Sequence, residues 1–174
     1  MRKIVLTYGV IAGLIIVALM VITFSIGAAS EGSSMSMVIG YATMIVSLSM
    51  IFFGIRNYRD NYSGGSITFR RGFLIGLYIS TIASLFYVIG WKIYSSIAIP
   101  DFADKYAKHI IDNLKKSGAT DSTIIAKTKE MAEWKQMYAN PFFELGMTFL
   151  EIFPVGLLIS VICALILKRK PKVG

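Results

Sequence analysis

The chain has 174 residues, of which 55% are hydrophobic and 16% charged, and its mean hydropathy is +0.65. A water-soluble domain of this length carries fewer apolar residues, so the composition excludes that class. The net charge of +8 does not indicate nucleic-acid binding, because the basic residues flank apolar segments and form no patch interleaved with aromatic residues. We therefore expect an integral membrane protein that binds no nucleic acid.

Four apolar segments are each long enough to cross a membrane. Each offers about 20 predominantly apolar residues, the length of a helix that spans roughly 30 Å of hydrocarbon. These segments are, approximately, residues 4–27, 35–55, 70–97 and 142–167. The first follows Arg2 and Lys3, as a secretory signal would, but its apolar run exceeds the roughly 7 to 15 residues of a signal. The sequence predicts an all-α membrane protein in which residues 1–174 form one domain of four transmembrane helices.

The first two spans are predicted to be neighbours. Their connection, residues 28–34, contains only small or polar residues, and its length suits a tight hairpin of antiparallel helices. Gly9 and Gly13 of the first span have the four-residue spacing that lets two helices approach closely, and Ser47 and Ser49 lie among apolar residues of the second. These residues favour packing within the bundle over homodimer formation, and both over a catalytic use of the serines.

The connection between spans two and three contains the motif YSGGSITFRRG at residues 62–72. A nucleotide-binding loop would have a strand before its glycines and a Gly-Lys-Ser/Thr sequence after them, and the motif has neither. We expect Gly64 and Gly65 to form a turn and Ser66 or Thr68 to cap the third span.

Basic residues indicate the orientation of the spans. The N-terminus, the second connection and the tail carry Arg2, Lys3, Arg56, Arg59, Arg70, Arg71, Lys168, Arg169, Lys170 and Lys172. Four alternating spans place these segments on one side, so the positive-inside rule predicts cytoplasmic termini. The third connection has seven lysines and would lie outside, but all six arginines of the chain are on the predicted cytoplasmic side. We also expect Arg70 and Arg71, beside free helix amides, to contact anionic lipid headgroups.

The third connection, about residues 100–140, is too long for a structureless loop. We expect Pro100 to open one helix and Gly118 to end it, and Asp121 to cap a second helix that ends before Pro141. Apolar residues recur at helical spacing at Phe102, Tyr106, Ile110 and Leu114, and then at Ile124, Thr128, Met131, Trp134 and Tyr138. This pattern predicts an amphipathic helical hairpin outside the membrane.

The apolar faces of this hairpin need a covering surface, which is each other, the ends of the spans, the bilayer interface or a partner protein. Trp134 and Tyr138 are typical of an aromatic belt at a membrane interface. His109 and Cys163 are the only histidine and cysteine, so neither has a partner of its own kind for a metal site. We expect no metal or cofactor.

Three ionisable residues lie within the apolar segments: Lys92, Glu144 and Glu151. Their burial is costly unless they are paired, hydrated or able to reach the interface. Distances along ideal helices place all three toward the outer boundary, so Lys92 could bridge to Glu151 or Glu144, or could extend to water by itself. Pro154 lies three residues after Glu151 and predicts a kink in the fourth span.

Four segments carry a resemblance to a known family. They are Arg-Asn-Tyr-Arg-Asp at residues 56–60, Gly-Gly-x-Ile-Thr-Phe at 64–69, Ile-Pro-Asp-Phe at 99–102 and the basic tail. Together and in this order they resemble the domain-of-unknown-function 4199 family of small integral membrane proteins, found mainly in Bacteroidota. The resemblance covers almost the whole chain. It implies a bacterial inner-membrane protein, and it implies no activity and no site residue.

Three functional classes remain to be weighed. The absence of a nucleophile with its base, a metal-ligand set and a phosphate-binding loop disfavours an enzyme. A structural or interaction protein, anchored in lipid and using its outer hairpin to contact a partner, accounts for the amphipathic helices. The alternative is a small transporter or channel component with an outer vestibule near Lys92 and Glu151. A dry contact between these charges would favour the interaction protein.

Overall fold

The computed structural model describes residues 1–26 and 34–170, and this part of the chain contains seven α-helices. They are α1 (Arg2–Ser25), α2 (Ser34–Leu48), α3 (Met50–Tyr62), α4 (Phe69–Ala98), α5 (Phe102–Lys116), α6 (Asp121–Tyr138) and α7 (Pro141–Leu167). Four segments are long and apolar enough to cross a membrane: α1, residues 37–62 of α2 and α3, α4, and α7. The protein is therefore an all-α membrane protein with four membrane-spanning segments.

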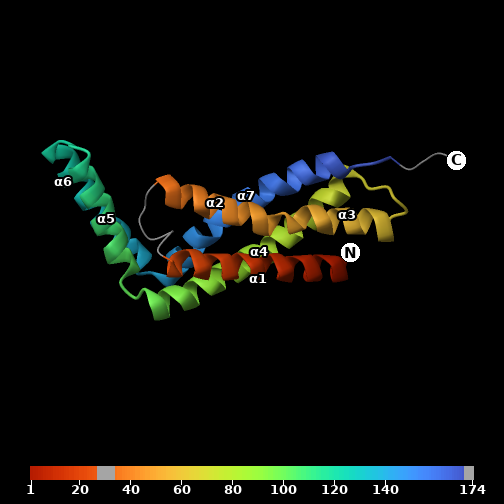
Figure 1. Ribbon diagram of the computed structural model, residues 1–174, viewed down its shortest axis with the longest axis horizontal. Helices are drawn as coiled ribbons and strands as arrows, with labels where there is room; N and C mark the ends of the chain where they lie inside the picture. The colour runs from red at the N-terminus through yellow and green to blue at the C-terminus, as the bar shows by residue number, and fades with distance from the viewer. Residues whose placement is uncertain (27–33, 171–174) are drawn as a thin grey trace.

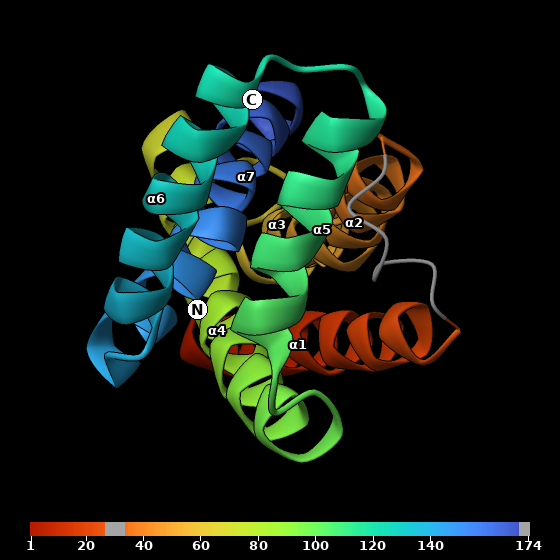
Figure 2. The same cartoon turned by 90° about the vertical axis from the view of Figure 1, so that its left-hand side faces the viewer.

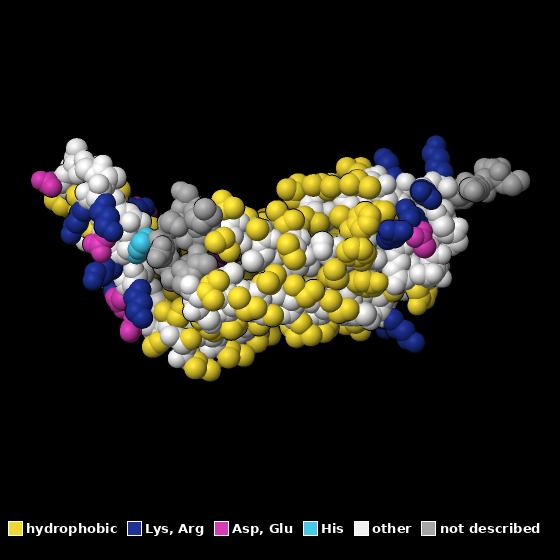
Figure 3. All heavy atoms as spheres, viewed as in Figure 1, with side chains coloured by type: hydrophobic (Ala, Val, Ile, Leu, Met, Phe, Trp, Pro, Cys, Tyr) yellow, Lys and Arg dark blue, Asp and Glu magenta, His cyan; other side chains and the backbone are white. Residues whose placement is uncertain are grey.

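The spans lie side by side along the long axis of the molecule (Figure 1). The start of α1, the end of α7 and the connection between α3 and α4 lie at one end of this bundle, which we call the termini end. The connected helices α5 and α6 lie beyond the other end, the α5–α6 end, where Figure 2 shows them side by side. Apolar side chains cover the middle of the face in Figure 3, and charged side chains gather at the two ends, as expected for a bundle surrounded by hydrocarbon.

The second span differs from its predicted bounds. It is divided into α2 and α3 at Ser49, where the serine hydroxyl donates to the carbonyl oxygen of Val46 at 2.6 Å. Such back-bonding by serine competes with the helical ladder and bends helices. The helix also continues to Tyr62, beyond the predicted end at residue 55, because a polar helical extension has no apolar signal to mark it.

The contact between α4 and α7 is a seam of small residues. Gly72 lies opposite Ala164, Gly76 opposite Ser160, and Ser80 opposite Gly156. A methyl group added to Gly156 would lie 1.9 Å from Oγ and 2.8 Å from Cβ of Ser80, so the two backbones approach as closely as these side chains allow. Each step of four residues toward the C-terminus of α4 corresponds to a step of four residues toward the N-terminus of α7. The three opposed pairs therefore fix the register of the two antiparallel helices.

Close approach also joins α1 to α4. A Cβ atom at Gly9 would meet Ile82, and one at Gly13 would meet Phe86, each at or below 3.0 Å. The two glycines therefore serve packing within the bundle, as predicted, with α4 as their partner. The predicted tight hairpin between the first two spans lies mainly in residues 27–33, outside the described part of the chain.

The termini end is closed by a contact between the α3–α4 connection and the segment after α7. Gly64 and Gly65 form the predicted turn. Their φ angles are 59° and 78°, which glycine adopts at little energetic cost because it has no Cβ atom. Thr68 caps α4, its hydroxyl accepting from the amide of Arg71 at 3.3 Å. Buried Ile67 exchanges two backbone hydrogen bonds with Arg169, of 3.1 and 2.9 Å.

Helices α5 and α6 begin at positions other than the predicted ones. The first begins at Phe102 with Asp101 as its N-cap, because Pro100 and Asp101 form a turn. It ends in a Schellman motif with Gly118 at a φ of 73°, the predicted stop. Thr120, and not Asp121, caps α6 by accepting from the amide of Thr123 at 3.4 Å.

The last span keeps its predicted extent. Asn140 caps α7, its side-chain oxygen accepting from the amide of Phe142 at 3.0 Å, and Pro141 occupies the first turn. The helix is continuous through Pro154, which has no amide proton to bond the carbonyl of Leu150. The kink at Pro154 stays a prediction.

Candidate functional site

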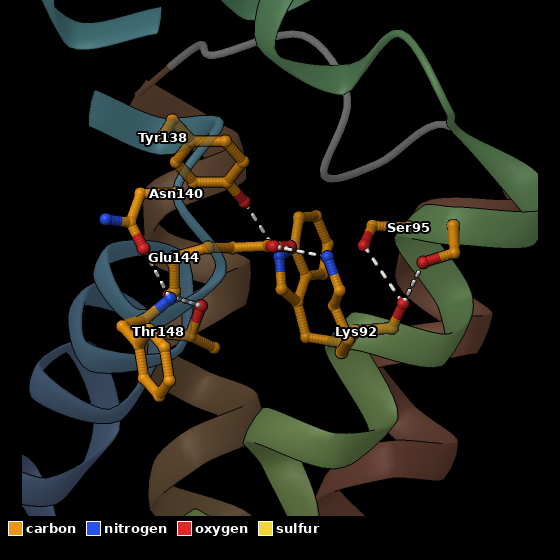
Figure 4. A network of polar contacts seen from close by, with 9 residues as sticks. Lys92, Ser95, Tyr138, Asn140, Glu144 and Thr148 are labelled. Atoms are coloured by element: carbon orange, nitrogen blue, oxygen red, sulfur yellow. Dashed lines mark hydrogen bonds and ion pairs between the residues drawn. The ribbon is translucent and has the colours of Figure 1, made fainter. Parts of the chain in front are cut away.

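The polar side chains at the α5–α6 end of the bundle form a connected cluster (Figure 4). Lys92 of α4 and Glu144 of α7 form an ion pair in which Nζ lies 2.5 Å from Oε2. The side chain of Glu144 is 7% exposed, whereas that of Lys92 is 45% exposed. The pair is therefore asymmetric, with a buried carboxylate covered by an ammonium group that reaches it from the surface.

The small-residue seam explains why these two charges meet. Lys92 is 20 residues beyond Gly72 (92 − 72 = 20), and Glu144 is 20 residues before Ala164 (164 − 144 = 20). Because Gly72 and Ala164 are opposite each other in antiparallel helices, residues displaced equally from them reach the same level. The ion pair is thus the last layer of the α4–α7 contact.

Local structure favours a negative charge at Glu144. This residue lies in the first turn of α7, where the free amides and the helix dipole stabilise an anion. Thr148 donates to its backbone carbonyl oxygen at 2.8 Å. The indole Nε1 of neighbouring Trp91 donates to the hydroxyl of Tyr138 at 3.0 Å. Burial raises the pKa of the Tyr138 phenol above its ordinary value. The hydrogen bond from Trp91 opposes this shift, and the charges of Glu144 and Glu151 add to it.

Glu151 does not share the ammonium group of Lys92. It lies seven residues, or about 10 Å along the helix, deeper in α7 than Glu144. Its polar contact is with the Tyr87 hydroxyl, at an oxygen-to-oxygen distance of 3.5 Å, the long limit for a hydrogen bond. Of the two glutamates that the sequence left open as partners of Lys92, the structure thus pairs Glu144 with it and leaves Glu151 on the surface of the bundle.

Seven aromatic rings connect helices α5 and α6 to the bundle. Successive ring centroids lie between 4.7 and 6.0 Å apart. The rings are those of Phe24, Trp91, Tyr94, Phe102, Tyr106, Trp134 and Tyr138. Such tilted and edge-on pairs add stabilisation beyond the burial of their area. Trp134 and Tyr138, assigned from sequence to a membrane belt, are therefore also packed within the protein.

A groove of about 800 Å³ runs between α5 and α6. Ala107, Ile111 and Met131 provide apolar lining, and an ion pair between Lys135 and Asp104 ties the two helices together at one rim. The remaining lining residues are Lys108, Asp112, Lys115, Thr128, Ala132, Gln136 and Ala139. Thr128, expected on the apolar stripe of α6, is exposed, so the apolar face of α6 is narrower than the sequence pattern implied.

The other residues singled out in the sequence lie apart from this cluster. Arg70 and Arg71 are exposed at the termini end, where lipid contact remains a prediction. Arg59 is instead buried, with Nε 2.7 Å from Oδ1 of Asp60. Cys163 is buried in α7, and Nε2 of His109 lies 2.8 Å from Nδ2 of Asn113 on α5.

The sequence analysis missed the seam, the burial of Arg59 and the groove. The seam has a sequence signal, since Gly72, Gly76, Ser80 and Ser84 recur at four-residue spacing in α4, and Gly156, Ser160 and Ala164 do so in α7. The burial of Arg59 and the groove have no comparable signal. Both depend on how helices that are distant in the sequence pack.

Comparison with known proteins supports a single assignment. The sequence model of a family described as "Protein of unknown function (DUF4199)" matches residues 7–169. No curated protein and no solved structure matches the chain. The match extends from the first turns of α1 to the residue that pairs with Ile67, so it includes all four spans, α5 and α6. The chain belongs to the DUF4199 family.

Proposed function

We propose that this protein is an accessory membrane protein whose bundle anchors helices α5 and α6, and that the groove between these helices binds a partner protein. The observation that carries the proposal is the groove itself. Charged residues of both helices line the groove together with the apolar residues Ala107 and Met131. The helices that form the groove, α5 and α6, lie beyond the end of the four spans (Figure 1). An apolar floor with a polar rim is the usual composition of a protein-binding surface.

The attachment of α5 and α6 supports this function. Binding surfaces lose less entropy when the elements that carry them are already fixed. Here Phe102 of α5 and Tyr138 of α6 both contact the rings that continue to Trp91 of α4. The groove is therefore held at a defined position relative to the membrane.

The alternative, a transporter or channel component, finds less support. It needs a polar vestibule between Lys92 and an acidic partner, and a polar route inward. Lys92 and Glu144 are instead in direct contact, and the small-residue seam continues below them along α4 and α7. The sequence criterion concerned Lys92 and Glu151, which the structure does not pair. The direct contact of Lys92 with Glu144 in its place supports the interaction protein.

We further propose that the protein lies in the bacterial inner membrane with both termini in the cytoplasm. The arginines of the termini end support this orientation through the positive-inside rule. The groove then faces the periplasm, where its partner is an envelope protein or the outer part of another membrane protein. Cysteines introduced at Lys116 and Lys170 in a Cys163→Ala background should distinguish the orientations. We expect a membrane-impermeant thiol reagent to label the first and not the second in intact cells.

A photo-crosslinking amino acid placed around the groove tests the function. Lys108 and Thr128 line the groove, whereas Lys105 and Lys129 are exposed on the same helices without lining it. We expect one discrete adduct from the first two positions, and little or none from the second two. Ala132→Trp, which fills the groove, should abolish the adduct, and Ala126→Trp, an exposed change on the same helix, should not. Equal adducts from both sets, or insensitivity to Ala132→Trp, would refute the proposal.

A further inference from the structure

We propose that Glu151 marks a self-association surface, at which α7 of one chain packs against α7 of a second copy within the membrane. This surface is separate from the groove between α5 and α6, and the proposal does not depend on a partner for that groove. Three observations support the proposal: the position of the Glu151 carboxyl group in α7, its exposure, and its incomplete hydrogen bonding.

Glu151 lies in the part of α7 that is long and apolar enough to cross the membrane. It precedes Lys168 by 17 residues (168 − 151 = 17), which corresponds to about 26 Å along α7. If Lys168 marks one boundary of a hydrocarbon layer about 30 Å thick, Glu151 lies just inside the other boundary. Its helix neighbours Leu150 and Leu158 are 61% exposed, as residues in contact with acyl chains would be.

The other side chains of the described residues do not neutralise Glu151. Lys92 of α4, which is level with Glu144 and not with Glu151, is engaged by the more buried Glu144. The Tyr87 hydroxyl approaches at 3.5 Å, which leaves most of the acceptor capacity of the carboxyl group unused. An ionisable group in this situation faces a cavity or a further partner in known membrane proteins, since exposure to lipid is costly.

A second copy of the chain supplies such a partner by symmetry. Two copies inserted with the same orientation, and related by a twofold axis along the membrane normal, bring equal residues to equal depth. A carboxyl group in its neutral form both donates and accepts, so Glu151 is complementary to itself. Polar side chains of this kind hold transmembrane helices together by hydrogen bonds between them. Exposed Met147, Leu150 and Leu158 provide the apolar contact around this bond.

The test uses the full chain in lipid vesicles in a Cys163→Ala background. Single cysteines replace Met147 on the proposed surface, or Val46, an exposed apolar residue of α2, as the control. We expect disulfide-linked dimers from Met147→Cys and not from Val46→Cys. This difference should persist when the protein is diluted severalfold with lipid.

Variants of Glu151 separate a specific bond from general contact. Glu151→Leu should weaken association by about tenfold, measured by energy transfer between labelled copies, because it removes the hydrogen bonds between helices. Glu151→Gln keeps a donor and an acceptor and should retain most of the association. Unfolding midpoints of both variants verify that the monomer is intact. The proposal is overturned if wild type stays monomeric at every dilution, if both cysteines cross-link equally, or if Glu151→Leu associates as wild type does.

Discussion

Lys92 and Glu144 lie at the same level of two antiparallel helices because both are displaced by 20 residues from an opposed pair of small residues, Gly72 and Ala164. Their ion pair, with 2.5 Å between Nζ and Oε2, lies at the end of the small-residue seam. The three opposed pairs of that seam contain no charged residue. The different exposures of the two side chains lead to a directional prediction.

Removal of the lysine should cost more than removal of the acidic charge. Lys92→Met leaves a buried carboxylate without its cation, and we expect a loss of about 1–3 kcal/mol in unfolding free energy. Glu144→Gln lets the half-exposed lysine extend to water, so its cost should stay below about 1 kcal/mol. Unfolding in detergent measures both values. If the double variant were as unstable as the sum of the two single variants, the two residues would not be coupled.

The seam predicts a steric effect at Gly156. Gly156→Ala places a methyl group 2.8 Å from Cβ of Ser80, so α4 and α7 must separate, and we expect a loss of about 1–3 kcal/mol. Gly146→Ala is the matched control on the same helix, because a Cβ there meets nothing within 4 Å. This control should be neutral or stabilising by up to about 1 kcal/mol, since alanine favours helix over glycine.

A second substitution distinguishes a clash at Ser80 from a general effect of alanine. Combined with Gly156→Ala, Ser80→Gly removes the Cβ that the new methyl group meets and should restore part of the lost stability. Ser80→Ala keeps this Cβ and should restore little. Equal recovery with both second substitutions would show that the hydroxyl, and not the backbone approach, limits the space.

Tyr138 should make stability fall at alkaline pH. Burial raises its pKa above the ordinary value of 10.0, so the folded protein keeps the phenol proton where the unfolded chain releases it. The contribution is fully present below a pH of about 10 and is lost as the pH rises through the folded-state pKa. The difference in ultraviolet absorbance between wild type and Tyr138→Phe gives this pKa. A midpoint at or below 10 would contradict the burial of this hydroxyl.

The pairing of Ile67 with Arg169 predicts a local effect of shortening the chain. A chain that stops after Leu167 loses both hydrogen bonds, and exchange of the Ile67 amide proton should accelerate by at least about tenfold. A chain that stops after Lys170 keeps the bridge and is the control. The amide of Phe142 at the other end of the bundle should exchange at the same rate in both.

The extent to which sequence predicts this fold depends on the range of each signal. Apolar length located the four spans, and glycines located the turns at Gly64, Gly65 and Gly118, because these are local properties. From depth alone, Lys92 can pair with Glu144 or Glu151, since distances along ideal helices place it at a height between the two glutamates. The spacing of small residues in α4 and α7 would have resolved this choice.

Other features had no local signal. The bridge between Ile67 and Arg169 joins segments a hundred residues apart, and nothing in either segment alone indicates a strand. Thr120 and Asp121 are both common helix caps, and only the backbone angles at Thr120 show which residue precedes the helix. The groove arises from the facing of α5 and α6, which their separate apolar patterns do not determine.

The seam also sets an order of events during biosynthesis. The glycine and serine face of α4 is complete when that helix enters the membrane, but its partner α7 lies beyond α5 and α6 in the chain. Until α7 emerges, Gly76 and Ser80 have no helix to pack against, and their backbone is open to lipid or to the insertion machinery. Arrest of translation before α7 should therefore leave α4 inserted but accessible from the side. Synthesis of α7 would lock the bundle and bring Arg169 to Ile67, so that a contact at the termini end reports the completion of an assembly within the bilayer.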